Sequence, residues 1–506
     1  MGTGPKLNPG QASLPTPNST KSFWHSQPSE KLIGHRTTES LPRRADVVIV
    51  GSGISGAFAA HFLRGDEKEA ARGLDVVMVE AREGCWGATG RNGGHCQPLI
   101  YGNPPDIGAF ELRNWNFIKS FIAQNQIPCE WRALPACHSY MSKSLFALAV
   151  KHAKKLQELD PKLGALFDIV EKDSTKPLSL EDLRVPKAQG AIVTDSAASL
   201  WPYKLVCWIL ENLISSNNSE SGSGSGSFNL QTNTSATSLQ KLDDGSWIVH
   251  TDRGMIAAKN VLLTTNAYTS HLLPKFSDLI VPVRGEMSSL LPPKSLKTER
   301  VMARRLDHSY GFVGHATQNI NQDDYLIQRP FTPSSPSSTI TSNPESNSIG
   351  GELMFGGGRA YAASAGVGVS DDSSIDEPAA AYLRRELNIV LDLDNDDHEL
   401  TASYEWSGIM GFSRDERPWV GPVTEELGGG KGLWVCAGYT GHGMPNASLC
   451  AKALVELMLG KEDDEVDLPE AYKVNGKRIE TARMLDEVAV ADSKDSTLLM
   501  HDGIDA

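Results

Sequence analysis

The chain has 506 residues, which is enough for two or three domains with cores of their own. Its formal net charge of -14 argues against a nucleic acid or an anionic membrane as partner. No run approaches the roughly 18 apolar residues of a membrane-spanning helix. Seven cysteines at irregular spacing fit a reducing cytosol better than a disulfide framework, and no Cys/His group has zinc spacing. We therefore expect a cytoplasmic protein without a metal.

Residues 1–44 are polar and rich in Pro, Ser and Thr, and they lack the apolar core of a secretory signal. This composition predicts a mostly irregular arm. Phe23 and Trp24 form an aromatic patch within the arm, which we expect to dock on the body of the protein.

A βαβ pattern begins at residue 46. Residues 47–50 (Val-Val-Ile-Val) predict a strand buried on both faces. Gly51 then allows a tight turn, Gly53 lets a pyrophosphate approach the backbone, and Gly56 lets the next helix pack against the strand. The positive end of that helix favours phosphates. A second apolar run ends at Glu80, where such a fold places the acid that binds a ribose hydroxyl. The pattern predicts a dinucleotide site, compatible with NAD or FAD.

A second glycine-rich segment, residues 87–94, follows the predicted ribose-binding acid. Glycine at this density indicates that the backbone approaches a ligand closely, although a flexible surface loop is the alternative. Arg91 and Asn92 are interleaved with the glycines and His95 follows them, which favours a ligand loop.

Apolar periodicity outlines the rest of the chain. It predicts helices over residues 107–125, 145–170, 202–215, 376–393 and 445–459, and strands over residues 247–250, 255–257, 261–265, 281–287, 310–313, 325–329, 352–356 and 433–438. Residues 215–227 and 332–348 have the composition of surface insertions. The segment after residue 461 is polar and acidic, and we expect it to be loose or wrapped on the surface.

Residues 46–56, 87–95 and 438–443 together resemble the D-amino-acid oxidase / sarcosine oxidase superfamily of FAD-dependent oxidoreductases. The middle loop is most similar to the gamma-glutamylputrescine oxidase-like branch. The resemblance implies a mixed α/β (α+β) fold, with a Rossmann-like FAD-binding domain of the glutathione-reductase type and an antiparallel-sheet substrate domain. We accordingly expect an arm (1–44), an FAD-binding domain (45–110, 190–275 and 404–460), a substrate domain (111–189 and 276–403) and a C-terminal tail (461–506).

The resemblance also implies which residues hold FAD. It assigns the pyrophosphate to Gly51, Ser52, Gly53, Ser55 and Gly56, the adenosine ribose to Glu80 and Arg82, the ribityl chain and flavin to Thr89, Gly90, Arg91, Asn92 and Gly94, and the far edge of the isoalloxazine to Gly441, His442, Gly443 and Met444. Some relatives attach FAD through a cysteine before the last strand. Residues 404–420 contain no cysteine, and Gly408 takes that place, so we expect non-covalent FAD.

The implied reaction is oxidation of a small amine or amino acid by hydride transfer to flavin N5, with O2 as the expected acceptor and H2O2 as the product. His95 is a candidate for the flavin face, and the alternative is a hydrogen-bonded loop histidine. Arg284 and Arg329 are candidates for binding a substrate carboxylate, and each has an ordinary ion pair as its alternative. Tyr325 and Trp406 are expected in core packing rather than in a pocket wall.

Two other functions stay open at this point. The same fold supports oxidation of a CH–OH donor such as a sugar, a polyol or a hydroxy acid. A non-catalytic binding protein that reuses the fold is the third hypothesis. The enzyme hypotheses require a small-molecule substrate and O2 or another electron acceptor.

Overall fold

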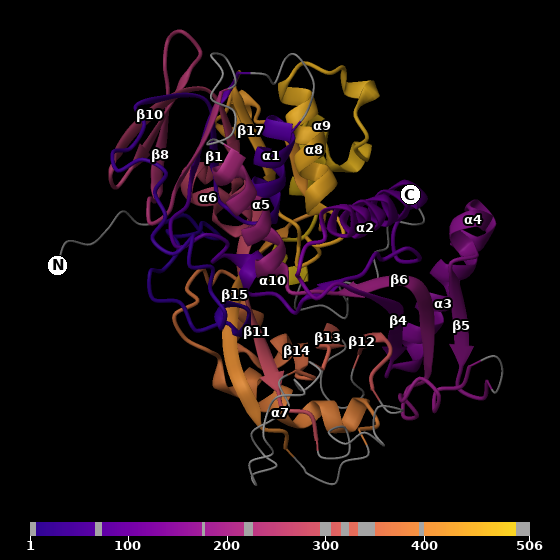
Figure 1. Ribbon diagram of the computed structural model, residues 1–506. Coiled ribbons are helices and arrows are strands. Elements are labelled where there is room, and N and C mark those ends of the chain that lie inside the picture. Colours follow the sequence, from indigo (N-terminus) through magenta and orange to yellow (C-terminus); the bar gives the residue numbers. More distant parts are fainter. Residues whose placement is uncertain are drawn as a thin grey trace, which may run out of the picture.

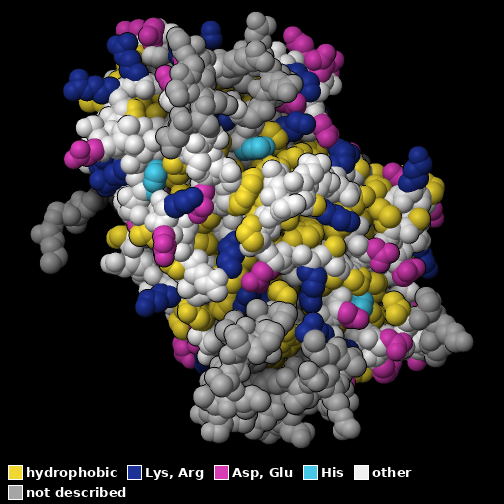
Figure 2. Space-filling view, viewed as in Figure 1, with side chains coloured by type: hydrophobic (Ala, Val, Ile, Leu, Met, Phe, Trp, Pro, Cys, Tyr) yellow, Lys and Arg dark blue, Asp and Glu magenta, His cyan; other side chains and the backbone are white. Residues whose placement is uncertain are grey.

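The computed structural model describes residues 7–65, 73–174, 178–216, 226–293, 305–314, 323–331, 350–393 and 399–491. Most of the first predicted insertion and all of the second lie outside these ranges, as does the end of the predicted tail. Within them the strands form two sheets (Figure 1). No helix of the described chain has the length and apolarity needed to cross a membrane. Acidic and basic side chains are interspersed on the face seen in Figure 2.

The first sheet has the strand order β16-β17-β10-β1-β2-β7, and β9 and β8 extend from β10. Its strands are β1 (Arg44–Val50), β2 (Asp75–Val79), β7 (Ser227–Gln231), β8 (Ala236–Lys241), β9 (Trp247–Thr251), β10 (Gly254–Leu263), β16 (Trp419–Pro422) and β17 (Leu433–Ala437). β1 is parallel to β2 and β10, and β10 is parallel to β17. The carboxyl ends of these strands therefore meet at one edge, where an α/β sheet binds ligands.

Helices cover one face of this sheet and explain the double burial of β1. α1 (Ile54–Gly65), α2 (Pro105–Asn125), α5 (Pro202–Ser216) and α8 (Ala447–Met458) share one core with Val47 and Ile49. Val48 and Val50 point into a second core on the opposite face, which includes Ile479 of α9 (Gly476–Met484). The prediction of a strand buried on both faces is confirmed, whereas the start of the predicted tail is packed rather than loose.

The second sheet has the order β15-β11-β14-β13-β12-β4-β6-β3, with β5 paired to β6. Its strands are β3 (His95–Cys96), β4 (Arg132–Tyr140), β5 (Phe167–Glu171), β6 (Gly190–Ser199), β11 (Ile280–Leu290), β12 (Ser309–Val313), β13 (Asp323–Gln328), β14 (Leu353–Gly357) and β15 (Ala402–Ser413). Most neighbours are antiparallel, and β12 pairs with β4 in parallel. α7 (Glu377–Val390) covers the face that points away from the first sheet (Figure 1). The expected mixed α/β fold is confirmed.

One predicted helix, over residues 145–170, is wrong in its second half. The structure has α3 (Lys143–Leu159), a single turn α4 (Pro161–Gly164) and then strand β5. Asp160 caps α4 by accepting from the N–H groups of Lys162 and Leu163, and Pro161 occupies its first turn. Since this turn ends the helical run, the next residues are free to pair with β6. The remaining short helices are α6 (Thr269–Leu272) and α10 (Val488–Ala491).

The strand pairing differs from the expected division of the chain at two boundaries. β6 and β15 lie in the second sheet, although residues 190–199 and 404–413 were expected in the FAD-binding domain. α2, most of which was expected in the substrate domain, shares the core of α1 and α8. Sequence periodicity predicts single helices and strands but does not indicate which sheet a strand joins. These domain boundaries could therefore not be predicted from it.

The N-terminal arm is irregular, as predicted, but its aromatic patch is part of the core. Phe23 and Trp24 lie in the 3-10 turn Phe23–His25 and are buried. Trp201 Nε1–H donates to the carbonyl oxygen of Trp24 (2.8 Å). The arm is therefore a packed element of the fold.

His25, at the end of that patch, gives the protein an acid-sensitive contact. Its ring stacks on Trp86 (3.8 Å between ring centroids). The pKa of His25 is lowered to about 3, mainly by burial and further by the positive charges of Arg91 and Arg82. The hydrogen bond to the Cys85 carbonyl oxygen has a smaller effect than burial, in the opposite direction. The unfolded chain binds a proton at this residue below pH 6.5 and the folded chain does not. Its stabilising contribution is therefore complete above pH 6.5 and falls as pH decreases toward 3.

We expect His25→Phe to reduce the acid sensitivity of folding, because phenylalanine keeps the stacking and removes the proton. Each pH unit below 6.5 costs the wild type about 1.4 kcal/mol at this residue. Urea unfolding at pH 7, 6 and 5 measures the difference. Equal pH dependence in both proteins would contradict the assignment.

Candidate functional site

A cavity of about 1050 Å3 lies between the two sheets. It is lined by the turn after β1, by the loop after β2, by residues 441–444 before α8, and by side chains of the second sheet. Leu14 and Pro15 of the arm also line it. Fourteen of the predicted site residues lie on this lining: Gly51, Ser52, Gly53, Ser55, Glu80, Arg82, Thr89, Arg91, Asn92, His95, Gly441, His442, Gly443 and Met444.

The first glycine segment has the geometry that its sequence predicts. Gly51 has φ +104°, and a Cβ there would lie 2.8 Å from the carbonyl oxygen of Thr264. A Cβ on Gly56 would lie 2.1 Å from the Gly51 carbonyl oxygen, so this position packs α1 against the turn instead of lining the cavity. Gly53 has little protein around its Cβ position, since Thr89 Oγ1 (3.2 Å) is the only atom of the described non-neighbouring residues within 4 Å. The backbone at Gly53 can therefore be approached closely by a ligand.

Glu80 holds the same turn from the end of β2. Its Oε2 accepts from the N–H (2.9 Å) and the hydroxyl (2.6 Å) of Ser52, and its Oε1 accepts from the N–H of Arg82 (3.0 Å). The carboxylate thus organises the glycine turn and borders the cavity. We propose that it also binds the ribose, as the sequence indicated.

The second glycine segment contributes mostly backbone. The hydroxyl of Thr89 accepts from the N–H at the start of α1 (3.0 Å). Gly90 and Gly94 do not line the cavity, because each allows close packing: a Cβ would lie 2.2 Å from the Cys85 carbonyl oxygen in the first case and 2.6 Å from the Leu200 carbonyl oxygen in the second. These two positions shape the loop and lie outside the cavity lining.

The third segment is supported by a buried acid that sequence reasoning missed. Glu111 of α2 accepts from His442 Nε2–H (3.0 Å), the N–H of Leu99 (2.7 Å) and Asn446 Nδ2 (3.1 Å). It is 1% exposed and lines the cavity. A glutamate within an amphipathic helix normally indicates a solvated face, so only its environment distinguishes it. Glu111 ties α2 to residues 442–446.

The sequence profile of the family described as "FAD dependent oxidoreductase" matches residues 46–457. The chain belongs to this family.

Two relatives align over most of the chain. The "Probable oxidoreductase OrdL" of Rhizobium meliloti is 23% identical over 452 residues, covering 85% of this chain and 87% of that protein. The gamma-glutamylputrescine oxidoreductase of Escherichia coli is 22% identical over 438 residues, covering 82% and 84%.

Solved structures share the fold. Glycine oxidase from Geobacillus kaustophilus superposes with a TM-score of 0.61 at 16% identity, covering 86% of this chain and 99% of that chain. L-amino acid deaminase from Proteus vulgaris gives a TM-score of 0.61 at 15% identity, covering 85% and 97%. The protein is therefore an FAD-dependent oxidoreductase with the fold of these enzymes.

The lining residues fit FAD. The open face of Gly53, the start of α1 and the acid Glu80 suit a pyrophosphate with an adjoining ribose. Residues 441–444 line the same cavity, so one ligand can contact both the first and the third glycine segment. None of the described lining residues is a cysteine. Gly408 lines the cavity where some relatives carry one, which keeps non-covalent binding as our prediction.

His95 lies at the second-sheet side of the cavity and begins a chain of polar contacts. Its Nε2–H donates to Gln97 Oε1 (2.5 Å), and Gln97 Nε2 donates to His138 Nε2. His138 Nδ1–H donates to the Tyr101 hydroxyl (2.5 Å), which lies 2.7 Å from the Tyr140 hydroxyl. An amide oxygen can only accept, so the proton of a neutral His95 is on Nε2 and the lone pair is on Nδ1.

The environment keeps both histidines uncharged. Burial is the main cause that lowers the pKa of His95 to about 4 and that of His138 to about 3. Nearby histidine charges lower both further, while the bond from His95 to Gln97 raises the pKa of His95. The hydroxyl of Ser309, 2.7 Å from His95 Nε2, adds a second partner. Sequence reasoning found His95 but missed Gln97 and His138, because their role depends on a contact between β3 and β4 across β6.

The two arginines expected to bind a substrate carboxylate do not line the cavity. Arg284 pairs with Glu286 (3.3 Å) and Asp376 (3.5 Å). Arg329 donates to Glu130 (2.8 Å) and Glu352 (2.7 Å). Both guanidinium groups form ion pairs within the protein. An ion pair of this kind was the alternative to substrate binding for each arginine.

Among the described arginines, Arg359 lines the cavity from the second sheet and was not predicted. Its guanidinium lies over the Phe412 ring at 4.5 Å from the ring centroid. Tyr325 also lines the cavity, with its ring centroid 5.7 Å from that of His95, although core packing was expected for it. Trp406 is fully buried in the core, as expected.

Glu286 is a further unpredicted acid on the lining. It is 4% exposed, and its Oε2 has no hydrogen bond among the described residues, whereas Oε1 accepts from the N–H of Asp376 (3.1 Å). Burial raises the pKa of Glu286 to about 8, against the lowering effect of that N–H and of Arg284. This carboxyl is therefore largely protonated at neutral pH.

We expect Arg329→Met to destabilise the protein by about 2 kcal/mol, because it removes charge-assisted hydrogen bonds to the partly buried carboxylates of Glu130 and Glu352. The KM for any substrate should not change in the folded variant. Urea unfolding and steady-state kinetics measure the two effects. A raised KM with unchanged stability would restore Arg329 as a substrate ligand.

Proposed function

We propose that this oxidoreductase oxidises a small amine or amino acid at the carbon bearing nitrogen, with O2 as electron acceptor. The observation that supports this most is the neutral His95 on the cavity lining, with its proton on Nε2 and an acceptor lone pair on Nδ1. A hydride leaves the carbon readily only when the neighbouring nitrogen is unprotonated. A neutral acceptor can hold such an N–H group, whereas a charged histidine would repel the ammonium form.

The names of similar proteins support the same donor. One relative is a gamma-glutamylputrescine oxidoreductase, and the structures with the same fold include a glycine oxidase and an L-amino acid deaminase. Each is named for an amine or amino acid. Their low identity to this chain leaves the choice of substrate to its own residues.

FAD, when bound, supplies the group that accepts the hydride from the donor carbon. The chain binds and orients the reactants. Gly53 and the start of α1 hold the phosphates, and residues 441–444 place a helix start near the far end of the cavity, where it favours negative charge. His95 accepts the N–H of the donor, and Gln97 keeps the lone pair of His95 on Nδ1. Arg359 brings a positive charge to the cavity lining, where an arginine can bind a carboxylate on the donor.

Anaerobic mixing with matched donors tests the reaction. We expect the yellow absorbance of the holoenzyme to bleach with primary amines or amino acids and to persist with the corresponding alcohols and hydroxy acids. With O2 present, peroxide should form in equal amount to the donor consumed. Bleaching by alcohols or sugars alone would favour the CH–OH alternative. A colourless protein that FAD does not reconstitute would indicate a binding protein.

We expect the donor amine to shape the pH dependence, together with Glu286 on the lining, whose pKa of about 8 lies in the same range. His95 and His138 stay neutral above about pH 5, because their pKa values are lowered to about 4 and 3. Between pH 6 and 9 the bleaching rate at subsaturating donor should rise with the fraction of unprotonated amine. Stopped-flow measurements with two amines of different pKa should shift the profile accordingly. A profile independent of the donor would contradict an amine substrate.

Acid precipitation tests the mode of FAD binding. We expect all the yellow colour in the supernatant, since no described cysteine lines the cavity. Colour retained in the pellet would show a covalent link.

A further inference from the structure

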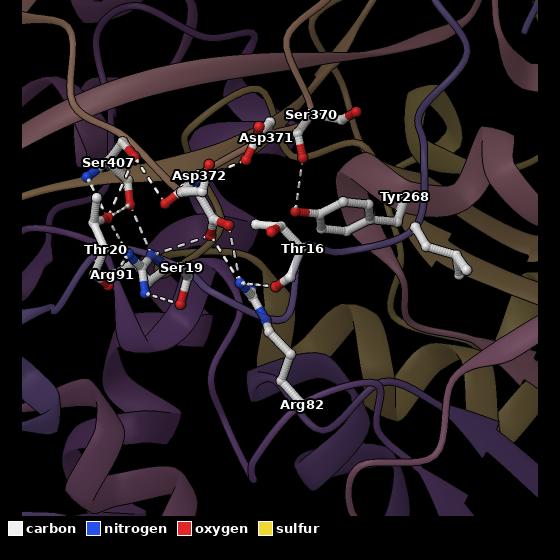
Figure 3. A network of polar contacts seen from close by, with 12 residues as sticks. Thr16, Ser19, Thr20, Arg82, Arg91, Tyr268, Ser370, Asp371, Asp372 and Ser407 are labelled. Atoms are coloured by element: carbon white, nitrogen blue, oxygen red, sulfur yellow. Dashed lines mark hydrogen bonds and ion pairs between the residues drawn. The ribbon is translucent and has the colours of Figure 1, made fainter. Parts of the chain in front are cut away.

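A buried carboxylate joins three segments that are far apart in the sequence. Asp372, in the loop before α7, is 0% exposed. Both of its oxygens accept from Arg82 Nη1 (3.0 Å each), and Arg91 Nε lies 3.3 Å from its Oδ2 (Figure 3). Arg82 and Arg91 are the cationic residues of the loop that follows β2, and both line the cofactor cavity. Asp372 thus fixes this loop at two points.

Each nitrogen of the Arg91 guanidinium donates to a group of the protein. It donates to the carbonyl oxygen (2.5 Å) and the hydroxyl (2.5 Å) of Thr20, to Ser19 Oγ (3.2 Å) and to the carbonyl oxygen of Ser407 (2.7 Å). Its side chain is 1% exposed. The guanidinium of Arg91 therefore points into the arm, while the residue as a whole stays on the cavity lining.

The arm is attached to the same loop as Asp372. The N–H of Thr20 donates to the carbonyl oxygen of Asp372 (2.8 Å), and Ser13 Oγ lies 2.9 Å from Ser370 Oγ. On the other side, the Tyr268 hydroxyl donates to the carbonyl oxygen of Ser370 (3.4 Å), and Tyr268 lines the cavity. Between these two attachments, Leu14 and Pro15 form part of the cavity wall. The contacts around Asp372 therefore hold the part of the arm that lines the cavity.

We propose that Asp372 is a positioning residue of the cofactor site, which holds the N-terminal arm against the loop after β2 so that FAD leaves only when this clamp opens. The proposal depends on the family's cofactor and not on the identity of the substrate. It assigns Arg82 and Arg91 to the closure of the site, with their charges compensated in part by one carboxylate.

The charges of Arg82, Arg91 and Asp372 would by themselves change FAD release in the direction opposite to the clamp, so the two effects can be told apart. Two arginines and one aspartate carry a net positive charge beside a cavity that receives an anionic pyrophosphate. Removing the negative charge would strengthen the attraction for FAD if electrostatics alone mattered. Removing it would release FAD faster if the clamp matters. The two effects have opposite signs in the release rate.

The test compares Asp372→Asn with Asp371→Asn in the full-length holoenzyme. Asp371 is the adjacent residue on the same loop, is exposed, and accepts from the N–H of Ser373 (2.9 Å). FAD release is followed by the fluorescence of free flavin after dilution. We expect release at least 10-fold faster from Asp372→Asn and an unchanged rate from Asp371→Asn. An unchanged or slower rate in folded Asp372→Asn would overturn the proposal.

A second pair of variants changes Thr20, the residue of the arm that bonds to Arg91, and again measures FAD release. Thr20→Val removes the hydroxyl that accepts from Arg91 and from the N–H of Ser407 (3.1 Å) while it keeps the side-chain shape. We expect a several-fold faster release from Thr20→Val and rescue by Thr20→Ser, with FAD-saturated unfolding temperatures alike in both. This pair decides the question if Asp372→Asn fails to fold. Equal release from Thr20→Val and Thr20→Ser would then count against the clamp.

Discussion

Gly56→Ala should yield a protein that binds FAD roughly 10- to 100-fold more weakly, the equivalent of the 1–3 kcal/mol that overpacking costs. Alanine normally stabilises a helix relative to glycine by up to about 1 kcal/mol. Here its Cβ would lie 2.1 Å from the Gly51 carbonyl oxygen and 2.9 Å from Thr264 Oγ1, so either α1 or the phosphate turn must move. Fluorescence titration of the apoprotein with FAD measures the loss.

Gly476→Ala is the matched control, since Gly476 begins α9 and no atom lies within 4 Å of its Cβ position. We expect unchanged FAD affinity and equal or higher stability. Unaltered FAD binding by Gly56→Ala would mean that the turn tolerates displacement. The tight approach of α1 would then not be a requirement of the site.

His95→Leu should slow anaerobic bleaching by an amine about 10- to 100-fold while FAD stays bound. The substitution removes the acceptor for the donor N–H and leaves Gln97 Oε1 with one partner fewer inside the protein. Ser309 still donates to Gln97 Oε1, so the main loss is the acceptor for the donor N–H, and an unsatisfied buried polar group costs about 1–3 kcal/mol. Stopped-flow reduction over a range of donor concentrations separates binding from the hydride step.

His61→Leu provides the comparison for that variant. His61 belongs to α1, packs edge to face against Phe58 and Phe121, and is absent from the cavity lining. It should bleach at the wild-type rate. A wild-type rate in His95→Leu would place His95 among structural loop residues, which was its alternative from the sequence.

The site could be predicted as far as its chemistry is local in the chain. Gly51, Gly53 and Glu80 act through the backbone turn that they themselves form, so their spacing was sufficient. Asp372 and Glu111 could not be found in this way. Asp372 meets Arg82 across 290 residues of chain, and Glu111 meets His442 across 331. A single acidic residue forms no recognisable sequence motif, so its role becomes visible only when the structure shows its partner.

The fold shows the same division between local and distant information. Strands with continuous apolar runs, such as β1 and β17, were predicted together with their common sheet. β6 and β15 were assigned to the wrong part, because partner choice depends on the whole sheet. Arg91 was placed in the right loop, but its side-chain direction depends on Thr20 and Ser407, which belong to other segments.

The position of the arm has a consequence for the order of events during synthesis. Thr20 is made early, yet its partner Ser407 lies 387 residues later in the chain. Thr20 therefore has no native partner on β15 until Ser407 has left the ribosome, and contacts of such high sequence separation form slowly. Because Leu14 and Pro15 of the arm line the cavity, the complete cofactor site can form only after β15 has been synthesised.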